Sequence, residues 1–203
     1  MKNKFNIKNA LLFVFVGLLL CSFSSNTKVE IKGWLLMGSK PESYEIGIED
    51  DVTRGGKVGF LKSTQKEING FGTIMQSFLP KDYIGKRLKL SGYIKSKDLI
   101  SWAGMWMRID GETIKNKPTN SLGFDNMQDR AIKKTTEWTK YEIVLDVPEA
   151  SKNISFGVLV NGTGNVWIDD LKFEIVDKTV PTTKKQNGLY LEKPTNTSFE
   201  DEN

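Results

Sequence analysis

Residues 102–110, Trp-Ala-Gly-Met-Trp-Met-Arg-Ile-Asp, combine aromatic, cationic and acidic side chains in an alternating order. Successive side chains of an extended strand point to opposite faces of a sheet. One face is then apolar and carries Ala103, Met105, Met107 and Ile109. The other carries Trp102, Trp106, Arg108 and Asp110. Two indoles beside a guanidinium and a carboxylate suit a polar ligand with flat apolar patches, such as a sugar ring. The alternative is that a second layer or a loop covers both indoles, because tryptophan is usually well buried.

Other segments are expected to extend this face into a groove. Alternation turns Tyr93 and Gln76 outward on their own strands, and the long connection 111–130 brings further polar groups to the rim, namely Asp125, Asn126 and Gln128. Rings can stack on the C–H face of a pyranose while Arg, Asn, Gln and Asp bond its hydroxyls, a usual composition for a small-ligand site. The rim residues have a second explanation, because Asp and Asn are common in turns. The grouping assumes that the strands concerned are neighbours.

Strand patterns fill the middle of the chain. The ranges that alternate or run apolar are 32–37, 44–49, 58–63, 71–78, 87–96, 102–110, 138–147, 153–161 and 165–176, separated by turn-forming residues. Only Ala131–Glu137 and the Pro80–Gly85 turn could hold a short helical piece. Many short strands without a long helical period predict an all-β, antiparallel sandwich or barrel.

The segment Val166-Trp167-Ile168-Asp169-Asp170-Leu171-Lys172-Phe173 resembles the last strand of jelly-roll carbohydrate-binding modules of the galactose-binding-like superfamily. Leu88–Ile94, Trp138-Thr139-Lys140-Tyr141 and Ile154–Val160 fit the same order of strands. Gly33-Trp34 and Phe71–Gln76 also resemble a group of uncharacterised bacterial proteins, some of which carry such a domain beside regulator or hydrolase domains. The resemblance implies one antiparallel β-sandwich (jelly roll, galactose-binding-domain-like) over 28–176 that binds a carbohydrate without altering it.

Asp169 and Asp170 admit two interpretations. In some related modules a late-strand Asp ligates a structural Ca²⁺, so the resemblance raises these two carboxylates as metal ligands. Calcium requires several oxygen ligands, however, and no calcium-loop spacing is present. The alternative, which we favour, is that they bond backbone amides or a nearby lysine. No other cofactor is expected.

Catalysis has little support in the sequence. The chain has no histidine, which excludes Ser-His-Asp and Cys-His catalysis and His-ligated zinc. Paired carboxylates could still cleave a glycosidic bond, with candidate pairs Glu45/Glu49, Asp110/Glu112 and Asp125/Asp129. None lies in a recognisable signature. The main alternative to carbohydrate binding is therefore a protein-interaction or structural module of the cell envelope, with a carboxylate-dependent hydrolase ranked below both.

The amino terminus predicts export. Lys2, Lys4 and Lys8 precede an apolar run over residues 10–20 that is too short for an ordinary transmembrane helix. Cleavage before Ser25, which would remove residues 1–24, and lipidation of Cys21 at a lipobox-like sequence both remain open. Cys21 is the only cysteine, so a folded domain would have no disulfide.

Charge and the carboxyl-terminal composition complete the prediction. The net charge of +4 falls to +1 without residues 1–24, which contain three lysines and no acid. That balance gives no support for nucleic-acid binding, and the membrane would be met only through a lipid on Cys21. Residues 177–203, rich in Lys, Thr, Pro and Asn, are expected to form a polar tail or linker.

Overall fold

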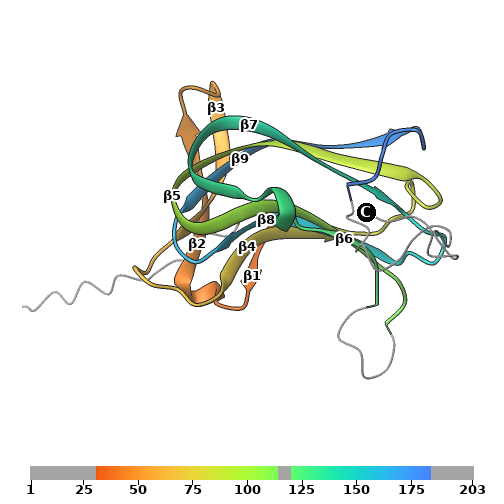
Figure 1. Cartoon of the computed structure of the whole chain (residues 1–203), viewed down its shortest axis with the longest axis horizontal. Coiled ribbons are helices and arrows are strands. Elements are labelled where there is room, and N and C mark those ends of the chain that lie inside the picture. Colours follow the sequence, from red (N-terminus) through yellow and green to blue (C-terminus); the bar gives the residue numbers. More distant parts are fainter. Residues whose placement is uncertain (1–30, 114–119, 184–203) are drawn as a thin grey trace, which may run out of the picture.

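Alternating apolar residues form nine antiparallel strands within residues 31–113 and 120–183, the part of the chain that the computed structural model describes (Figure 1). The strands are β1 (Leu35–Gly38), β2 (Tyr44–Asp51), β3 (Gly56–Ser63), β4 (Phe71–Phe78), β5 (Arg87–Asp110), β6 (Ser121–Asp125), β7 (Ile132–Asp146), β8 (Asn153–Asn161) and β9 (Asn165–Val176). Two short 3₁₀ turns, η1 (Pro41–Ser43) and η2 (Gln128–Arg130), complete the elements. None of the helices in this part of the chain is long and apolar enough to span a bilayer.

The long strand β5 folds the sheet into two layers. Its first part, Arg87–Lys97, pairs with β7 and β9, and its second part, Trp102–Asp110, pairs with β8 and β6. One layer therefore runs β1-β4-β8-β5-β6, and the other runs β2-β3-β9-β5-β7. We call them the β8 layer and the β9 layer. Figure 1 shows β5 turning between them.

The core lies between the two layers, and β5 contributes to it from both of its parts. Leu88, Leu90 and Ile94 point inward from the first part, whereas Met105, Met107 and Ile109 do so from the second. All six are fully buried. Inward positions change from even to odd numbers because the pairing register shifts repeatedly between Ile94 and Ala103, where Asp98 has a φ of 55°. The apolar face predicted for 102–110 is thus correct, and alternation along 87–96 likewise gives an apolar face toward the core.

Three sequence predictions about elements differ from the structure. The segments 87–96 and 102–110 are one strand, because Asp98 bends the chain without ending it. Ala131–Glu137 is not helical, since β7 starts at Ile132 and pairs with the bend of β5, which satisfies its backbone as strand. The connection 111–130 contains β6, which pairs with the end of β5.

The first residues after β9 pack against the sandwich rather than leaving it. Arg87 Nη1 donates to the carbonyls of Lys178 and Val180, each at 2.6 Å. Thr183 exchanges hydrogen bonds with the backbone of Val144 on β7, at 2.9 Å in each direction. Residues 178–183 are therefore bonded to the start of β5 and to Val144 near the end of β7. The rest of the expected tail, and the whole expected export signal with Cys21, lie outside the described residues.

Gly157 tests how closely β4 and β8 approach. A Cβ on Gly157 would lie 2.1 Å from the Ile74 carbonyl oxygen and 3.0 Å from Met75 Cα, so backbone must move to admit it. We expect Gly157→Ala to lower the free energy of unfolding in urea by about 1–3 kcal/mol, the usual cost of overpacking. Gly59→Ala is the control, because its Cβ would meet nothing closer than 3.8 Å. Equal stability of the two variants would contradict this account.

Candidate functional site

Trp102 and Trp106 lie on the outer face of the β8 layer, opposite the core residues of the same strand. The two rings differ in exposure, and only Trp102 keeps part of its surface open. Trp106 is only 7% exposed, and its Nε1 donates to Thr73 Oγ1 at 2.8 Å. Trp102 is half-buried. Trp106 therefore offers almost no free ring surface for stacking, although it does not lie between the layers.

Arg108 lies on the same outer face, at the rim of a separate polar cavity. Its Nε donates to both carboxylate oxygens of Asp110, at 2.9 and 3.0 Å. The cavity, of about 600 Å³, is also lined by Asn120, Lys152 and Asn153. Arg108 is thus held in place by Asp110, and Trp106 is not among the residues that line this cavity.

The structure does not bring Tyr93 and Gln76 to this face. Tyr93 belongs to the first part of β5 and pairs with Asp169 of β9, so it lies in the other layer. Gln76 lies directly opposite Phe156, a core residue, and paired residues share a face. Gln76 therefore points to the inner side of β4. The predicted common groove is wrong for both residues, because it assumes a strand order that the sequence does not specify.

The three predicted rim residues make local bonds. Asp125 is 8% exposed and accepts from Met127 N, from Arg130 Nη2 at 2.7 Å and from Thr183 Oγ1 at 2.5 Å. Asn126 Oδ1 accepts from the backbone of Gln128 at 3.1 Å, and Gln128 itself is exposed. Asp125 therefore joins the end of β6 to the segment after β9.

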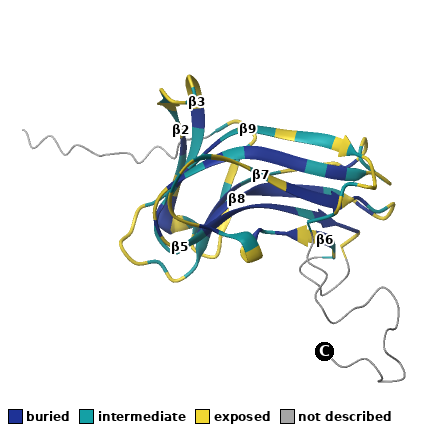
Figure 2. Ribbon diagram, turned by 45° about the horizontal axis from the view of Figure 1, so that its top comes forward, coloured by how far each residue is buried: buried dark blue, intermediate teal, exposed yellow. Residues whose placement is uncertain are grey.

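A different set of residues gathers on the outer face of the β9 layer. Aromatic rings and cations alternate there in a row drawn from β3, β9, β5, β7 and the turn between β2 and β3. In spatial order the members are Phe60, Lys62, Trp167, Lys95, Trp138, Arg54 and Tyr93. We call this set the aromatic–cation row. In Figure 2, β9 and β3 carry partly exposed segments, whereas β8 is buried along most of its length.

Distances within the row distinguish its ends from its middle. Lys62 Nζ lies 4.1 Å from the centre of the Phe60 ring, and Arg54 Cζ lies 4.3 Å from that of Tyr93. Lys95 Nζ lies farther from both indoles, 5.3 Å from Trp138 and 5.0 Å from Trp167. The two end rings are therefore directly covered by cations, whereas the two central indoles are covered less closely. Both indoles are half-buried.

Carboxylates neutralise each cation of the row. Glu49 pairs with Lys62 at 2.5 Å, Asp51 pairs with Lys95, and Asp169 accepts from Arg54 Nε at 2.8 Å. The hydrogen bonds from Lys95 and from Thr53 hold the pKa of Asp51 well below its usual range. Burial alone would raise the pKa of Glu49, but its hydrogen bonds from Lys62 and Trp167 lower it. Glu49 and Asp51 are therefore ionised partners near neutral pH, which does not suit a proton-donating role.

These contacts require the β2–β3 hairpin to curl over the outer face. In the sheet, β3 and β9 lie between β2 and β5, yet Asp51 at the end of β2 reaches Lys95 on β5. Pairing permits this, because β3 is bonded to β9 only over Gly59–Lys62. Trp138 Nε1 also donates to Thr53 Oγ1 in the turn, at 3.2 Å. The turn thus forms a wall at one end of the outer face.

Asp169 and Asp170 hold the turn through Arg54. Asp170 has a φ of 52°, a conformation that Asp tolerates better than most residues, and the register with β5 shifts between Ser91 and Tyr93. This irregularity lets Ile168 and Leu171 both face the core while both acids reach Arg54. Within residues 31–113 and 120–183 no three His, Cys, Asp or Glu side chains gather to hold a metal.

Sequence reasoning does not identify the aromatic–cation row. Lys95 is two residues from Tyr93, so alternation places it on the same outward side, but Trp138 and Trp167 enter only as parts of motifs. Arg54 precedes Gly55 and Gly56, which indicate a turn, and no neighbouring residue indicates a further role, because its partner Asp169 is 115 residues away. Only the order of strands shows that these side chains meet.

No protein-family model matches the chain. It is 47% identical over 176 residues to a Bacillus subtilis (strain 168) protein described as the uncharacterized HTH-type transcriptional regulator YbfP. The match covers 85% of this chain, which spans 58% of the length of that relative. The similarity thus covers most of this chain, but little more than half of the relative.

Three solved structures have a similar fold at low sequence identity. The CBM22-1–GH10 modules of Clostridium thermocellum Xyn10B, complexed with xylohexaose, match at a TM-score of 0.52 and 13% identity over 78% of this chain and 29% of theirs. The enzymatically active domain of bacteriophage CBA120 tailspike protein 4 matches at a TM-score of 0.52 and 13% identity. This match covers 72% of this chain and 20% of the tailspike chain. A putative sugar binding protein from Bacteroides thetaiotaomicron matches at a TM-score of 0.50 and 16% identity. This match covers 73% of this chain and 90% of that protein's chain. The predicted antiparallel jelly-roll β-sandwich is thereby confirmed, and carbohydrate-binding modules share it.

The charges that hold the hairpin predict a dependence on pH. Asp51 and Glu49 have lowered pKa values in the folded chain, compared with about 3.9 and 4.3 when unfolded. Their stabilising contribution is therefore complete above about pH 5 and is lost as the pH falls below about 4. We expect Asp51→Asn to lower the free energy of unfolding at about pH 7. The difference in this free energy between the variant and the wild type is expected to narrow between about pH 4 and pH 2.

Asp50→Asn is the matched control for this experiment. The Asp50 side chain is 79% exposed and pairs with Lys57, whose side chain is 69% exposed, so the loss of this carboxylate should change stability little at any pH. If the difference in free energy of unfolding between Asp51→Asn and wild type stays constant down to about pH 2, the role assigned to the Asp51 carboxylate is contradicted.

Proposed function

We propose that this sandwich binds a carbohydrate without altering it, on the outer face of the β9 layer. The observation that carries the proposal is the pair of half-buried indoles, Trp138 and Trp167, on either side of Lys95. They lie beside the wall that the β2–β3 turn forms. The predicted kind of surface, with indoles and charged groups together, is retained, but the proposed location changes from the Trp102/Trp106 face to this one.

The chemistry of this face favours a neutral, hydroxyl-rich ligand. An indole offers a flat apolar surface to the C–H face of a sugar ring, and its amphipathic character suits a partly wet site. Lysine ammonium groups donate to hydroxyls, and the carboxylates accept from them. Because every cation of the row has an acidic partner, the face offers no net charge that would select an anionic ligand.

The proposal of binding rather than hydrolysis follows from how the acids are used. Glu49 and Asp51 are bonded to lysines, and Asp125 to an arginine and a threonine. A general acid for glycoside cleavage would need a raised pKa, whereas those of Glu49 and Asp51 are lowered. The shared fold with carbohydrate-binding modules supports the same conclusion at the level of fold.

The regulator-like relative supports a second candidate, in which the sandwich senses a soluble saccharide as one part of a longer regulator. The basic and apolar amino terminus favours our first candidate, an exported module. Cell fractionation of the native protein, with mass measurement of its amino terminus, separates the two. An exported module is expected outside the cytoplasm with residues 1–24 removed or Cys21 lipidated, and an intact cytoplasmic chain would favour the sensor.

Substitution of the two indoles tests the proposed face. We expect Trp138→Ala and Trp167→Ala each to weaken retention on a neutral-glycan affinity gel about tenfold, since losing about 1.4 kcal/mol of ring contact corresponds to that factor. The control is Trp102→Ala, which removes a half-buried indole from the other outer face. Loss of retention in Trp102→Ala alone would place the site on the β8 layer instead.

A further inference from the structure

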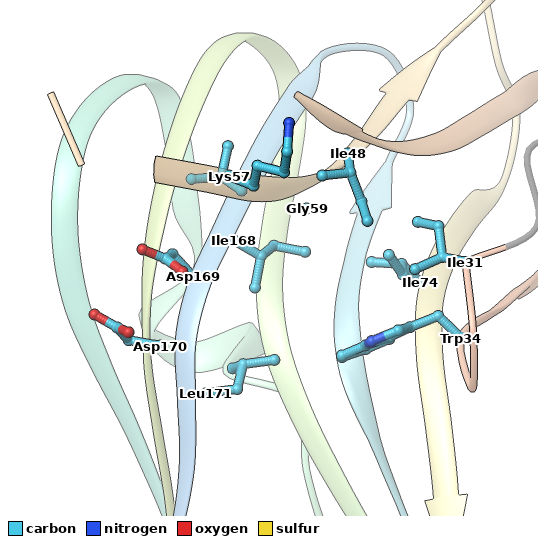
Figure 3. A pocket seen from close by; sticks show the side chains of 11 residues that line it. Ile31, Trp34, Ile48, Lys57, Gly59, Ile74, Ile168, Asp169, Asp170 and Leu171 are labelled. Carbon is cyan, nitrogen blue, oxygen red and sulfur yellow. The ribbon is translucent and has the colours of Figure 1, made fainter. Parts of the chain in front are cut away.

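A cavity of about 290 Å³ opens between the two layers, beneath the curled hairpin. Figure 3 shows side chains converging on it from both layers and from the segment before β1. Ile48 comes from β2, Ile74 from β4, and Ile168 and Leu171 from β9. Trp34 lies across its lower end in that view, and Lys57 stands at its upper end. This cavity lies on the inner side of the β9 layer, so it is separate from the aromatic–cation row.

The interior of the cavity is apolar, with polar groups at its margin. Ile74 and Ile168 are buried, and Ile48 is 52% exposed at the open side. Asp169, at the margin, is engaged by Arg54. The Lys57 ammonium lies 3.1 Å from Asp50 in an exposed pair, which contributes little stability. A polyol would leave its hydroxyls without partners against these walls, at a cost in free energy.

Three tryptophans donate a hydrogen bond from the indole N–H, and Trp34 differs from them. Trp106, Trp138 and Trp167 donate to Thr73, Thr53 and Glu49. Within residues 31–113 and 120–183, Trp34 Nε1 donates no hydrogen bond. Its ring is positioned by an edge contact with Phe156, with centres 5.6 Å apart. Trp34 therefore contributes an indole N–H without a partner among the described residues to a lining whose other polar side chains are Lys57, Asp169 and Asp170.

Gly59 is a second, independent indication of a ligand. It lies inside β3, opposite Ile48, and lines the cavity. An added Cβ would lie less than 3 Å from a neighbouring atom at Gly47, Gly92 and Gly157. At Gly59 the nearest atom to an added Cβ would be 3.8 Å away, and the backbone of Gly59 has no positive φ. A glycine inside a strand costs about 0.5–1 kcal/mol relative to alanine, and such glycines mark a bulge, a tight bend, or a place where a ligand or another backbone approaches closely. Here, its missing side chain keeps the cavity open.

We propose that this cavity binds a small, neutral, monocyclic compound of the phenol class. Ligand sites of about this volume bury most of a small molecule between apolar walls with a few polar groups. The ring would lie among Ile48, Ile74 and Ile168, and its oxygen would accept from Trp34 Nε1. This proposal does not depend on carbohydrate binding at the outer face.

The test uses 4-methylphenol, titrated into the full chain and followed by calorimetry and by the indole N–H signals in NMR spectra. We expect saturable binding that shifts the Trp34 N–H signal. Gly59→Leu places a side chain in the cavity and should weaken binding about tenfold or more. Gly56→Leu, in the same strand but with nothing within 4 Å of its Cβ, should bind as wild type does.

Absence of saturable binding to the wild-type chain would overturn the proposal, as would wild-type affinity in Gly59→Leu. If Gly59→Leu does not unfold cooperatively, Trp34→Phe replaces it. That variant keeps a ring but removes the donor, and unchanged affinity in it would equally reject the assigned site. Retention of Gly59→Leu on the neutral-glycan gel should match that of wild type, so failure here is distinguishable from failure of carbohydrate binding.

Discussion

The attachment of the β2–β3 turn to β5, β7 and β9 determines the shape of both candidate surfaces. Arg54 is bound by the two acids of β9 and stacks on Tyr93, while Asp51 binds Lys95. Individually, exposed ion pairs and cation–π contacts are weak. Here they share members, so each contact restricts the side chains used by the next. The curl that they maintain forms a wall on one side of the β9 layer and part of a cavity on its other side.

The curl also explains why two adjacent acids lie within β9. A regular strand would turn one of them toward the core, where an unpaired carboxylate is costly. The left-handed backbone of Asp170 removes this conflict, since it returns Leu171 to the core and leaves both carboxylates beside Arg54. A sequence motif that resembles a family signature is thus explained in this chain by local geometry and by one arginine.

Periodicity predicted most of the strands because it depends on neighbours in the chain. The inward sets Leu88, Leu90 and Ile94 and Met105, Met107 and Ile109 follow directly from alternation. The site was harder to predict, because it depends on which strands are adjacent. Tyr93 and Trp106 lie on one strand and both face outward, yet the bend at Asp98 places them on opposite sides of the molecule. Alternation also could not show that Trp106 is covered, since an outward direction does not specify what packs above it.

The bend of β5 couples the two layers mechanically. Because one continuous strand supplies hydrogen bonds to β7 and β9 and then to β8 and β6, neither layer retains a full complement of partners without the other. The sandwich is therefore expected to unfold in a single cooperative step, with no half-folded state in which one surface survives alone. Ile100, an apolar side chain that is 81% exposed, lies in this bend, and a chain break there would separate the part of β5 that pairs with β7 and β9 from the part that pairs with β8 and β6.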